Sequence, residues 1–194
     1  MNLPNISLKD LKIQLGVFTL GPFSFDFPVG SLSLIRGANG SGKTSLLRCL
    51  LGRIRQSAGH INGLPHQIGS VGSEGLLMTS WTVEQNWNFI LGLLGKKTEP
   101  LPSALSLIRS KRVSHLSLGQ RRKAELLSLF SLSLPLYLLD EPFSPLDQSE
   151  RHFFLNELKA LKTKGVTIIM TTHDEDLLTE KPAAILELPR SIQS

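Results

Sequence analysis

The run GANGSGKT at residues 37–44 constrains the fold of this chain more than any other feature. It fits the pattern G-x-x-x-x-G-K-[S/T] and lies between an apolar strand predicted at residues 31–36 and a helix predicted at residues 44–51. In that context the glycines let backbone N–H groups curl around phosphate oxygens, and the N-terminus of the helix adds a favourable dipole. An ordinary turn that caps a helix is the competing explanation, and the strand before the run argues against it. The run therefore predicts a phosphate-binding loop, or P-loop.

The P-loop predicts a site for a nucleoside triphosphate and Mg²⁺. Lys43 is expected to reach the β- and γ-phosphates, and the hydroxyl of Thr44 is expected to bind Mg²⁺. The segment is expected to contact the nucleotide through Gly37, Ala38, Asn39, Gly40, Ser41, Gly42, Lys43, Thr44 and Ser45.

Apolar runs and helical patterns alternate along the rest of the chain. Residues 11–27 predict an antiparallel edge of strands, and residues 136–139 and 166–170 predict buried strands of a parallel sheet. Helices are predicted at residues 83–94, 119–130 and 148–162, and a loop that contains proline at residues 96–103. The pattern predicts an α/β fold with a mostly parallel sheet, an antiparallel β edge and a helical insert at about residues 79–131.

Length and composition agree with a single domain over residues 1–194. Hydrophobic residues make up 41% and charged residues 19%, which is typical of globular proteins. The single cysteine, Cys49, is expected to be a small buried side chain. Neither a secretory signal nor a membrane-spanning segment is expected from the N-terminus or from the apolar run near residues 126–139.

The net charge of +5 permits contact with an anionic partner. The basic groups at residues 96–97, 109–112 and 121–123 lack interleaved aromatic residues, so we expect them on solvated faces and expect no nucleic-acid binding. Contact with lipid headgroups or with a partner is the alternative for these groups.

Two carboxylates follow the predicted strand at residues 136–139. Asp140 and Glu141 would emerge at its carboxyl end, where α/β sheets place ligands. The first carboxylate can hold Mg²⁺, and the second can orient or deprotonate the attacking water. An Asp-Glu-Pro turn is the alternative, and the P-loop in the same chain makes the catalytic interpretation the stronger one.

Three further segments carry polar groups that fit a phosphate site. Ser117 and Gly119 open a predicted helix and could bind phosphate, or could simply cap the helix. His173 follows a predicted strand and could hydrogen-bond the γ-phosphate, although a lone histidine is more often structural. Residues 144–147 look like a turn with a helix N-cap.

In this order the segments resemble the ABC ATPase family. Residues 37–44 resemble its Walker A loop, 116–120 its LSGGQ-type signature, 136–141 its Walker B strand and 144–147 its D-loop, while His173 resembles its switch histidine. The resemblance implies ATP hydrolysis with Glu141 as the catalytic carboxylate. It also implies that two copies pair head to tail on binding ATP, so that Ser117 and Gly119 act in trans, and that transmembrane permease subunits follow their motion.

Within the family, the run IRGANGSGKTSLLRCLLGRIRQSAGHI and the ending IIMTTHDEDL are most similar to the haem-exporter ATPases of cytochrome c maturation, the CcmA type. That resemblance implies a peripheral subunit on the cytoplasmic face of the inner membrane, attached through the permease. The ATPase of another small exporter and a non-transport ABC ATPase are the alternatives. This sequence does not identify the transported substrate, because the transmembrane subunits select it.

The sequence departs from the family at two positions. Leu118 replaces a glycine of the signature, and the glutamine of the family's Q-loop falls on Ser73 or Glu74. We expect Glu74 to take over the glutamine's contact with Mg²⁺, since a carboxylate also offers oxygen ligands; a solvent-facing loop residue is the alternative. The adenine is expected to stack on Phe18, with Phe23 as the other candidate.

Overall fold

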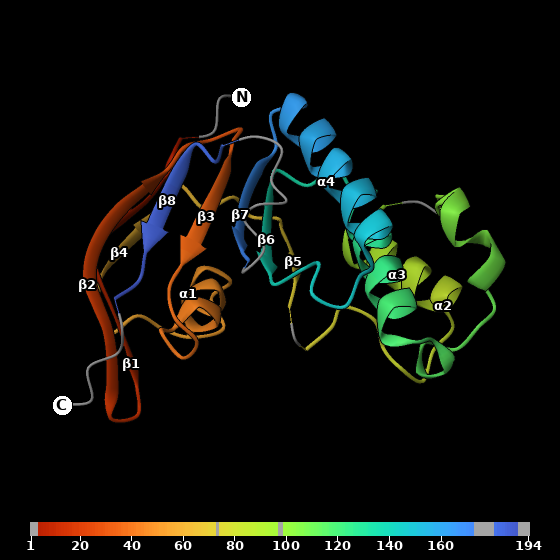
Figure 1. Ribbon diagram of the computed structural model, residues 1–194, viewed down its shortest axis with the longest axis horizontal. Helices are drawn as coiled ribbons and strands as arrows, with labels where there is room; N and C mark the ends of the chain where they lie inside the picture. Colours follow the sequence, from red (N-terminus) through yellow and green to blue (C-terminus); the bar gives the residue numbers. More distant parts are fainter. Residues whose placement is uncertain (1–3, 73, 97–98, 173–180, 190–194) are drawn as a thin grey trace.

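The computed structural model describes residues 4–72, 74–96, 99–172 and 181–189 (Figure 1). Their centre is a parallel sheet in the order β5-β6-β7-β3-β8. Its strands are β3 (Leu32–Arg36), β5 (Ile68–Val71), β6 (Leu136–Asp140), β7 (Thr167–Thr171) and β8 (Ala184–Glu187). The predicted strands at residues 31–36, 136–139 and 166–170 are confirmed, whereas β5 and β8 were not predicted.

A second, antiparallel sheet lies beside the first, with the order β2-β1-β4. Its strands are β1 (Ile6–Leu15), β2 (Phe18–Phe27) and β4 (Ala58–Asn62). The predicted antiparallel edge is therefore present, but it begins earlier than residue 11. It also gains its third strand from the segment that follows the first helix.

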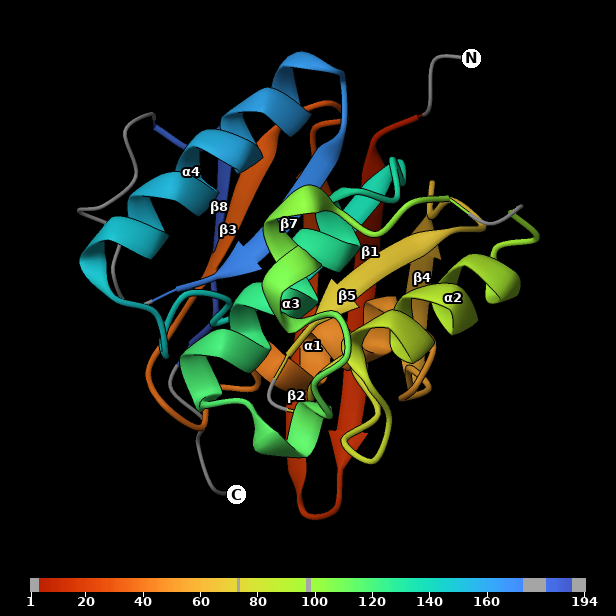
Figure 2. The ribbon, with the colours of Figure 1, turned by 90° about the vertical axis from the view of Figure 1, so that its right-hand side faces the viewer.

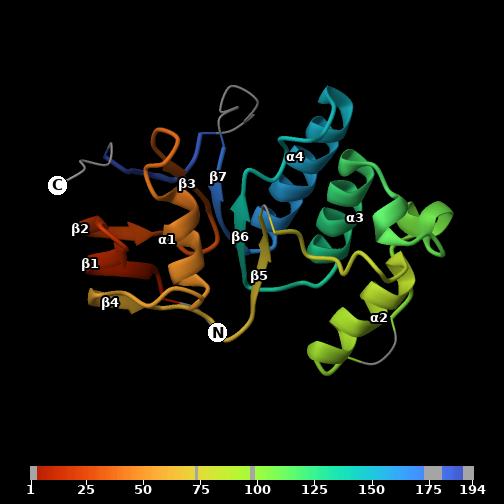
Figure 3. The ribbon, with the colours of Figure 1, turned by 90° about the horizontal axis from the view of Figure 1, so that it is seen from below.

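Helix α1 (Lys43–Leu50) lies between the two sheets (Figures 1 and 3). Its buried side chains, Leu46, Leu47, Cys49 and Leu50, join one hydrophobic cluster with the inner face of β1 and with residues of β3, β6 and β7. Burial raises the pKa of the Cys49 thiol, in agreement with the expected apolar role of this cysteine. Because both sides of α1 are covered, the P-loop at its N-terminus rests on a rigid base.

Helices cover the other face of the parallel sheet (Figures 2 and 3). They are α2 (Val83–Leu93), α3 (Leu118–Phe130), α4 (Gln148–Thr163) and the 3₁₀ helices Ser103–Ile108 and Val113–His115. Helices α3 and α4 contact the sheet, and α2 lies beyond them. Capping boxes begin α2 at Thr82 and α3 at Ser117.

The strands of the parallel sheet are apolar on both faces because each face packs against a different cluster. In β6, Leu136 and Leu138 face α1, whereas Tyr137 and Leu139 face the helices α3 and α4. This arrangement explains why residues 136–139 form a continuous apolar run rather than an alternating one. Within the described part of the chain, no helix has the length and apolar character needed to cross a membrane.

Candidate functional site

The P-loop connects the end of β3 to the start of α1 in a conformation that requires glycine. Gly37, Gly40 and Gly42 have φ angles of 148°, 80° and 96°. A Cβ atom on Gly37 would lie 2.4 Å from Oγ of Ser41, and one on Gly42 would lie 3.0 Å from the side chain of Leu20. Side chains are thereby excluded at Gly37 and Gly42, which lets backbone N–H groups of the loop approach an anion.

Two P-loop side chains are buried in positions that suit a phosphate ligand. Lys43 is only 9% exposed, and its Nζ donates to the carbonyl oxygens of Gly37 at 2.8 Å and Ala38 at 3.2 Å. The hydroxyl of Ser41 is buried and has no hydrogen-bond partner among the described residues. A phosphate would offer both groups stronger acceptors than the loop's own carbonyls.

A chain of hydrogen bonds joins the P-loop helix to the carboxyl ends of β6 and β7. The hydroxyl of Thr44 donates to Oδ2 of Asp140 at 2.7 Å, and the hydroxyl of Thr171 donates to Oδ1 at 2.7 Å. The backbone N–H of Glu141 in turn donates to Oγ1 of Thr171 at 3.0 Å. Both oxygens of Asp140 are therefore oriented, and Glu141 is fixed next to them.

Glu141 has a backbone conformation that is uncommon for a residue with a side chain. Its φ is 47°, in the left-handed region. Such conformations cluster at active sites, where the surrounding contacts hold them in place. Here the hydrogen bonds from the Glu141 N–H to Oγ1 and to the carbonyl oxygen of Thr171 supply those contacts.

Several of these groups, among them Lys43, Thr44, Asp140 and Glu141, line one cavity of about 510 Å³. It contains P-loop residues together with Asp140 and Glu141, and it also reaches the antiparallel sheet and α3. Its lining is Leu15, Phe18, Asn39, Gly40, Gly42, Lys43, Thr44, Ser45, Arg122, Asp140, Glu141 and Ser144. The size and the mixture of one aromatic wall with a glycine-rich cradle suit a nucleotide.

The oxygen donors also suit Mg²⁺. The hydroxyl of Thr44 and the carboxylate of Asp140 lie together in this cavity. The described residues hold no group of three or more His, Cys, Asp or Glu side chains that could bind a metal. Mg²⁺ is commonly held by one or two carboxylates, substrate phosphates and water, so this small donor set fits it.

Of the two aromatic candidates, Phe18 lines the cavity, and Phe23 is not among its lining residues. Both phenylalanines also pack partly against the cluster around α1. The structure therefore places Phe18, at the start of β2, beside the P-loop, as stacking on adenine would require.

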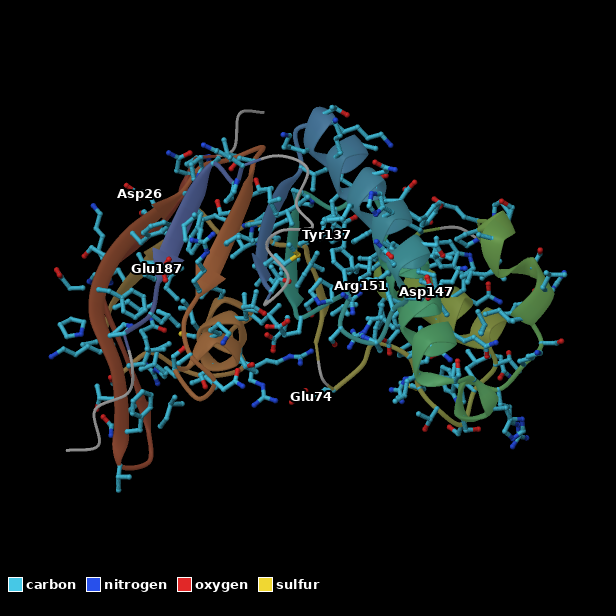
Figure 4. All side chains as sticks on the ribbon, in the orientation of Figure 1. Asp26, Glu74, Tyr137, Asp147, Arg151 and Glu187 are labelled. Atoms are coloured by element: carbon cyan, nitrogen blue, oxygen red, sulfur yellow. The ribbon has the colours of Figure 1, made fainter. Side chains whose placement is uncertain are left out.

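Glu74 follows β5, on the loop between α1 and the helical layer (Figure 4). Its two carboxylate oxygens pair with Arg48 and, at 3.1 Å, with Arg53. It shares a smaller cavity of about 140 Å³ with Thr44 and Asp140. The side chain is 58% exposed, and both of its oxygens have cationic partners.

Two predicted site residues, Ser73 and His173, lie outside the described residues. The signature residues Ser117 and Gly119 are described, but they do not line the P-loop cavity. Ser117 caps α3 by accepting a hydrogen bond from the N–H of Gln120 at 3.2 Å, and Leu118 beside it is 78% exposed.

The segment 144–147 forms the predicted turn and helix cap. Asp147 accepts a hydrogen bond from the N–H of Glu150 at 2.8 Å at the start of α4, and this bond lowers the pKa of the Asp147 carboxyl. Ser144 lines the P-loop cavity, and the carbonyl oxygen of Pro145 would lie 3.2 Å from a Cβ atom on Gly119. The turn thus connects the cavity wall to the start of α3.

Two residues of the site were not singled out from the sequence. Thr171 lies at the end of β7, directly beside Asp140 in the sheet, and a hydroxyl at the end of a strand next to a carboxylate was a usable signal. Arg122 lies within a basic run that was expected on a solvated face, but its side chain is only 12% exposed. That expectation is wrong for Arg122, because α3 packs this side chain against the loop after β5.

Comparison with known proteins agrees with this geometry. The sequence profile of the ABC transporter family matches residues 20–144. The chain is 33% identical to a protein of Colwellia psychrerythraea named "Cytochrome c biogenesis ATP-binding export protein CcmA", with 85% of this chain and 82% of that protein covered. The protein of the same name from Paracoccus denitrificans is 32% identical, with 97% and 90% covered.

Solved structures share the fold. A protein described as "Structure of ATP binding subunit of ABC transporter" superposes with a TM-score of 0.86 at 23% identity, covering 95% of this chain and 86% of that one. An inward-facing "putative metal-chelate type ABC transporter" superposes with a TM-score of 0.77 at 24% identity, covering 95% and 79%. The chain therefore belongs to the ABC transporter family, as one of its ATP-binding and ATP-hydrolysing subunits.

Proposed function

We propose that this subunit hydrolyses Mg-ATP in the cavity between the P-loop and β6, and that it powers an exporter in haem export and cytochrome c biogenesis. The observation that carries the proposal is the hydrogen-bonded series Thr44, Asp140, Thr171 and Glu141, of which Thr44, Asp140 and Glu141 line that cavity. A hydroxyl and two carboxylates therefore lie beside the P-loop, which supports a role in binding Mg²⁺ and activating water.

The P-loop binds the phosphates. Backbone N–H groups of the loop and the N-terminus of α1 take the negative charge, and Lys43 exchanges its two carbonyl partners for phosphate oxygens. Phe18 stacks on the adenine at the other end of the cavity. The nucleotide contacts are Gly37, Ala38, Asn39, Gly40, Ser41, Gly42, Lys43, Thr44, Ser45 and Phe18.

Thr44 and Asp140 hold Mg²⁺, which when bound neutralises charge on the phosphates. Glu74 is proposed as a further oxygen ligand from the loop after β5, because its cavity also contains Thr44 and Asp140. To reach a metal, its carboxylate would have to leave at least one of the two arginines that now hold it.

Glu141 acts as the general base for the attacking water. Its backbone is fixed by Thr171, so the side chain starts from a defined position at the end of β6. His173 follows the same strand, β7, and is proposed to hydrogen-bond the γ-phosphate.

The complete site is proposed to require a second copy of the chain. Ser117 and Gly119 offer a hydroxyl and a helix N-terminus, but they do not line their own chain's P-loop cavity. The exposed neighbour Leu118 leaves this end of α3 accessible to another surface. A homodimer that forms on ATP would place the signature of one copy over the nucleotide of the other.

ABC ATP-binding subunits work with transmembrane permease partners. For this chain we propose a peripheral position on the cytoplasmic face of the inner membrane, with membrane contact made through those permeases and without nucleic-acid binding. Haem export follows from the name shared by the relatives at 30–33% identity, which cover most of this chain.

Equilibrium binding and turnover test the site directly. Lys43→Ala should abolish binding of Mg-ATP, whereas Glu141→Gln should retain binding and lose hydrolysis, since it leaves the phosphate cradle intact. Hydrolysis by Glu141→Gln at the native rate would show that Glu141 is not the base. For the pathway, the tagged chain should co-purify with an integral membrane protein from detergent-solubilised membranes, and its deletion should abolish c-type cytochromes; normal cytochrome levels would contradict haem export.

A further inference from the structure

Arg122 is the one cationic side chain of α3 that lines the P-loop cavity. In the basic run 121–123, the side chains of Arg121 and Lys123 are 28% and 41% exposed, whereas that of Arg122 is 12% exposed. A guanidinium that is largely removed from water is costly unless its charge serves a contact.

The guanidinium of Arg122 is held from two sides. Nη2 donates to the carbonyl oxygen of Gly72 at 3.1 Å, and Nη1 forms an ion pair with Oε2 of Glu125 at 3.3 Å. Glu125 itself is 2% exposed and also accepts from the N–H of Leu76 at 3.0 Å. Arg122 and Glu125 thereby fix the loop after β5 against α3.

These two contacts do not use up the hydrogen-bonding capacity of Arg122. A guanidinium has five N–H donors, and Nη1 is buried without a hydrogen bond to any described residue, although it lies within ion-pair distance of Glu125. Burial lowers the pKa of Arg122, and the charges of Glu125 and Asp140 act in the opposite direction. Arginine side chains are not deprotonated in proteins, so the group remains charged.

We propose that Arg122 binds the terminal phosphate of the ATP held by its own chain. Arg122 lines the same cavity as Lys43, Asp140 and Glu141, where the phosphates and the two carboxylates bring negative charge together. A fixed guanidinium on this wall offsets the repulsion, and its planar donors match phosphate oxygens. The inference rests on the proposed nucleotide site and adds a contact to it.

Such a contact would give α3 a role at two nucleotides. Ser117 caps α3 and is proposed to face the ATP of the second copy. Arg122 lies about one and a half turns further along the helix and is proposed to face the ATP of its own chain. Because Arg122 also donates to the carbonyl oxygen of Gly72, loss of the terminal phosphate would change the charge next to α3 and next to the loop after β5 at the same time.

Binding of a non-hydrolysable ATP analogue, adenylyl imidodiphosphate, and of ADP to the full chain tests the proposal. Arg122→Gln should lower the affinity for the analogue by about tenfold or more and the affinity for ADP by less than about twofold, since only the analogue has a terminal phosphate at this position. Arg121→Gln is the matched control, because Nε of Arg121 pairs with the same Glu125 at 3.2 Å but Arg121 does not line the cavity. It should leave the ratio of the two affinities unchanged.

A second variant guards against misfolding. Arg122→Gln could lower the thermal midpoint of unfolding more than Arg121→Gln does, because it leaves Glu125 buried without this partner. The double variant Arg122→Gln with Glu125→Gln removes both buried charges. It should show the same selective loss of affinity for the ATP analogue over ADP. Equal weakening of both nucleotides, or a ratio equal to that of Arg121→Gln, would overturn the role of Arg122. If Lys43→Ala binds the analogue as the native chain does, the nucleotide site itself is wrong, a failure distinguishable from one confined to Arg122.

Discussion

The hydroxyl of Thr44 donates a 2.7 Å hydrogen bond to the carboxylate of Asp140 across the gap between α1 and β6. The two residues are far apart in sequence, and the bond joins the start of α1 to the end of β6 inside the P-loop cavity. If Mg²⁺ is held here, both oxygens must turn from each other to the metal. The strength of nucleotide binding should therefore depend on this pair only when Mg²⁺ is present.

Thr44→Val should remove the gain in ATP affinity that Mg²⁺ gives, and Thr44→Ser should restore it. Loss of one oxygen ligand is expected to lower the affinity for Mg-ATP by about tenfold, while the affinity for ATP in EDTA changes by less than about twofold. Titrations with and without Mg²⁺ measure both values. An equal loss in EDTA would mean that Thr44 supports the fold of the loop and does not bind the metal.

Dimerisation should require ATP. Because Ser117 and Gly119 lie outside their own chain's cavity, we expect the nucleotide to bridge two copies. Light scattering of Glu141→Gln is expected to give the monomer mass alone and twice that mass with Mg-ATP, and adding Ser117→Arg should keep it monomeric. A dimer that forms without ATP and tolerates Ser117→Arg would contradict the composite site.

Glu74→Gln and Glu74→Ala separate a metal contact from a surface ion pair. An exposed ion pair contributes only about 0.2–1 kcal/mol, so both variants should keep their stability. If Glu74 replaces the family's glutamine, Glu74→Gln retains ATPase activity with a weaker dependence on free Mg²⁺, because it has less negative charge to offset. Glu74→Ala then loses most of the activity. Equal ATPase activity in the native chain and in both variants would reject the metal contact, and the ion pairs with Arg48 and Arg53 would then be the role of Glu74.

Phe18→Ala should lower the affinity for ATP by about tenfold, since stacking of an aromatic side chain on a base contributes roughly 1–3 kcal/mol. Phe18→Tyr should restore the affinity. Phe23→Ala is the control: Phe23 packs against the same cluster but does not line the cavity, so this variant should lose stability without selective loss of ATP binding. Similar affinities for Phe18→Ala and Phe23→Ala would reject Phe18 as the adenine contact.

Tyr137→Phe should cost about 1–2 kcal/mol of unfolding free energy at pH 7. The buried hydroxyl accepts from the N–H of Leu134 at 3.1 Å and donates to the carbonyl oxygen of Leu129 at 3.2 Å, and the variant leaves both without this partner. Urea unfolding measures the difference; no change at pH 7 would show that these bonds contribute nothing net.

The same residue gives a pH dependence with a defined sign. Burial raises the pKa of Tyr137 above its value in the unfolded chain, while the bond from Leu134 lowers it. Its neutral form therefore stabilises the fold fully below about pH 10, and this contribution is lost as the pH rises through the higher folded-state pKa. The advantage of the native chain over Tyr137→Phe should shrink in that range. Because the chain has one tyrosine, phenolate absorbance reports this titration directly.

Local sequence patterns predicted β3, β6 and β7, the strands that end at the candidate site, and the loops that follow β3 and β6. The P-loop, the apolar strand before Asp140 and the serine cap of α3 are each set by neighbouring residues, so a single sequence was enough. Strand β5 has only four residues, Ile-Gly-Ser-Val, and owes its place to pairing with β6. Such a strand has no signal of its own.

The position of Arg122 could not be predicted for a related reason. Its neighbours in sequence are charged and partly exposed, and the helical period alone does not say which arginine faces the sheet. Its burial depends on Gly72 and Glu125, which α3 reaches only in the folded chain. Likewise, the pairing of Glu74 with two arginines of the α1 region depends on the loop's course after β5.

The covering of α1 by two sheets has a consequence for how the chain is made. Strand β3 and α1 are translated before both strands that pair with β3: these are β7, where Leu34 meets Met170, and β8, which begins at Ala184. Until β7 and β8 are made, β3 lacks both of its neighbours in the parallel sheet, and α1 lacks part of the apolar surface on which it packs. Contacts between such distant segments form slowly. The nascent chain should therefore be unable to bind ATP until β7 and β8 have been translated, and premature termination before β7 should give an aggregation-prone fragment rather than a smaller ATP-binding protein.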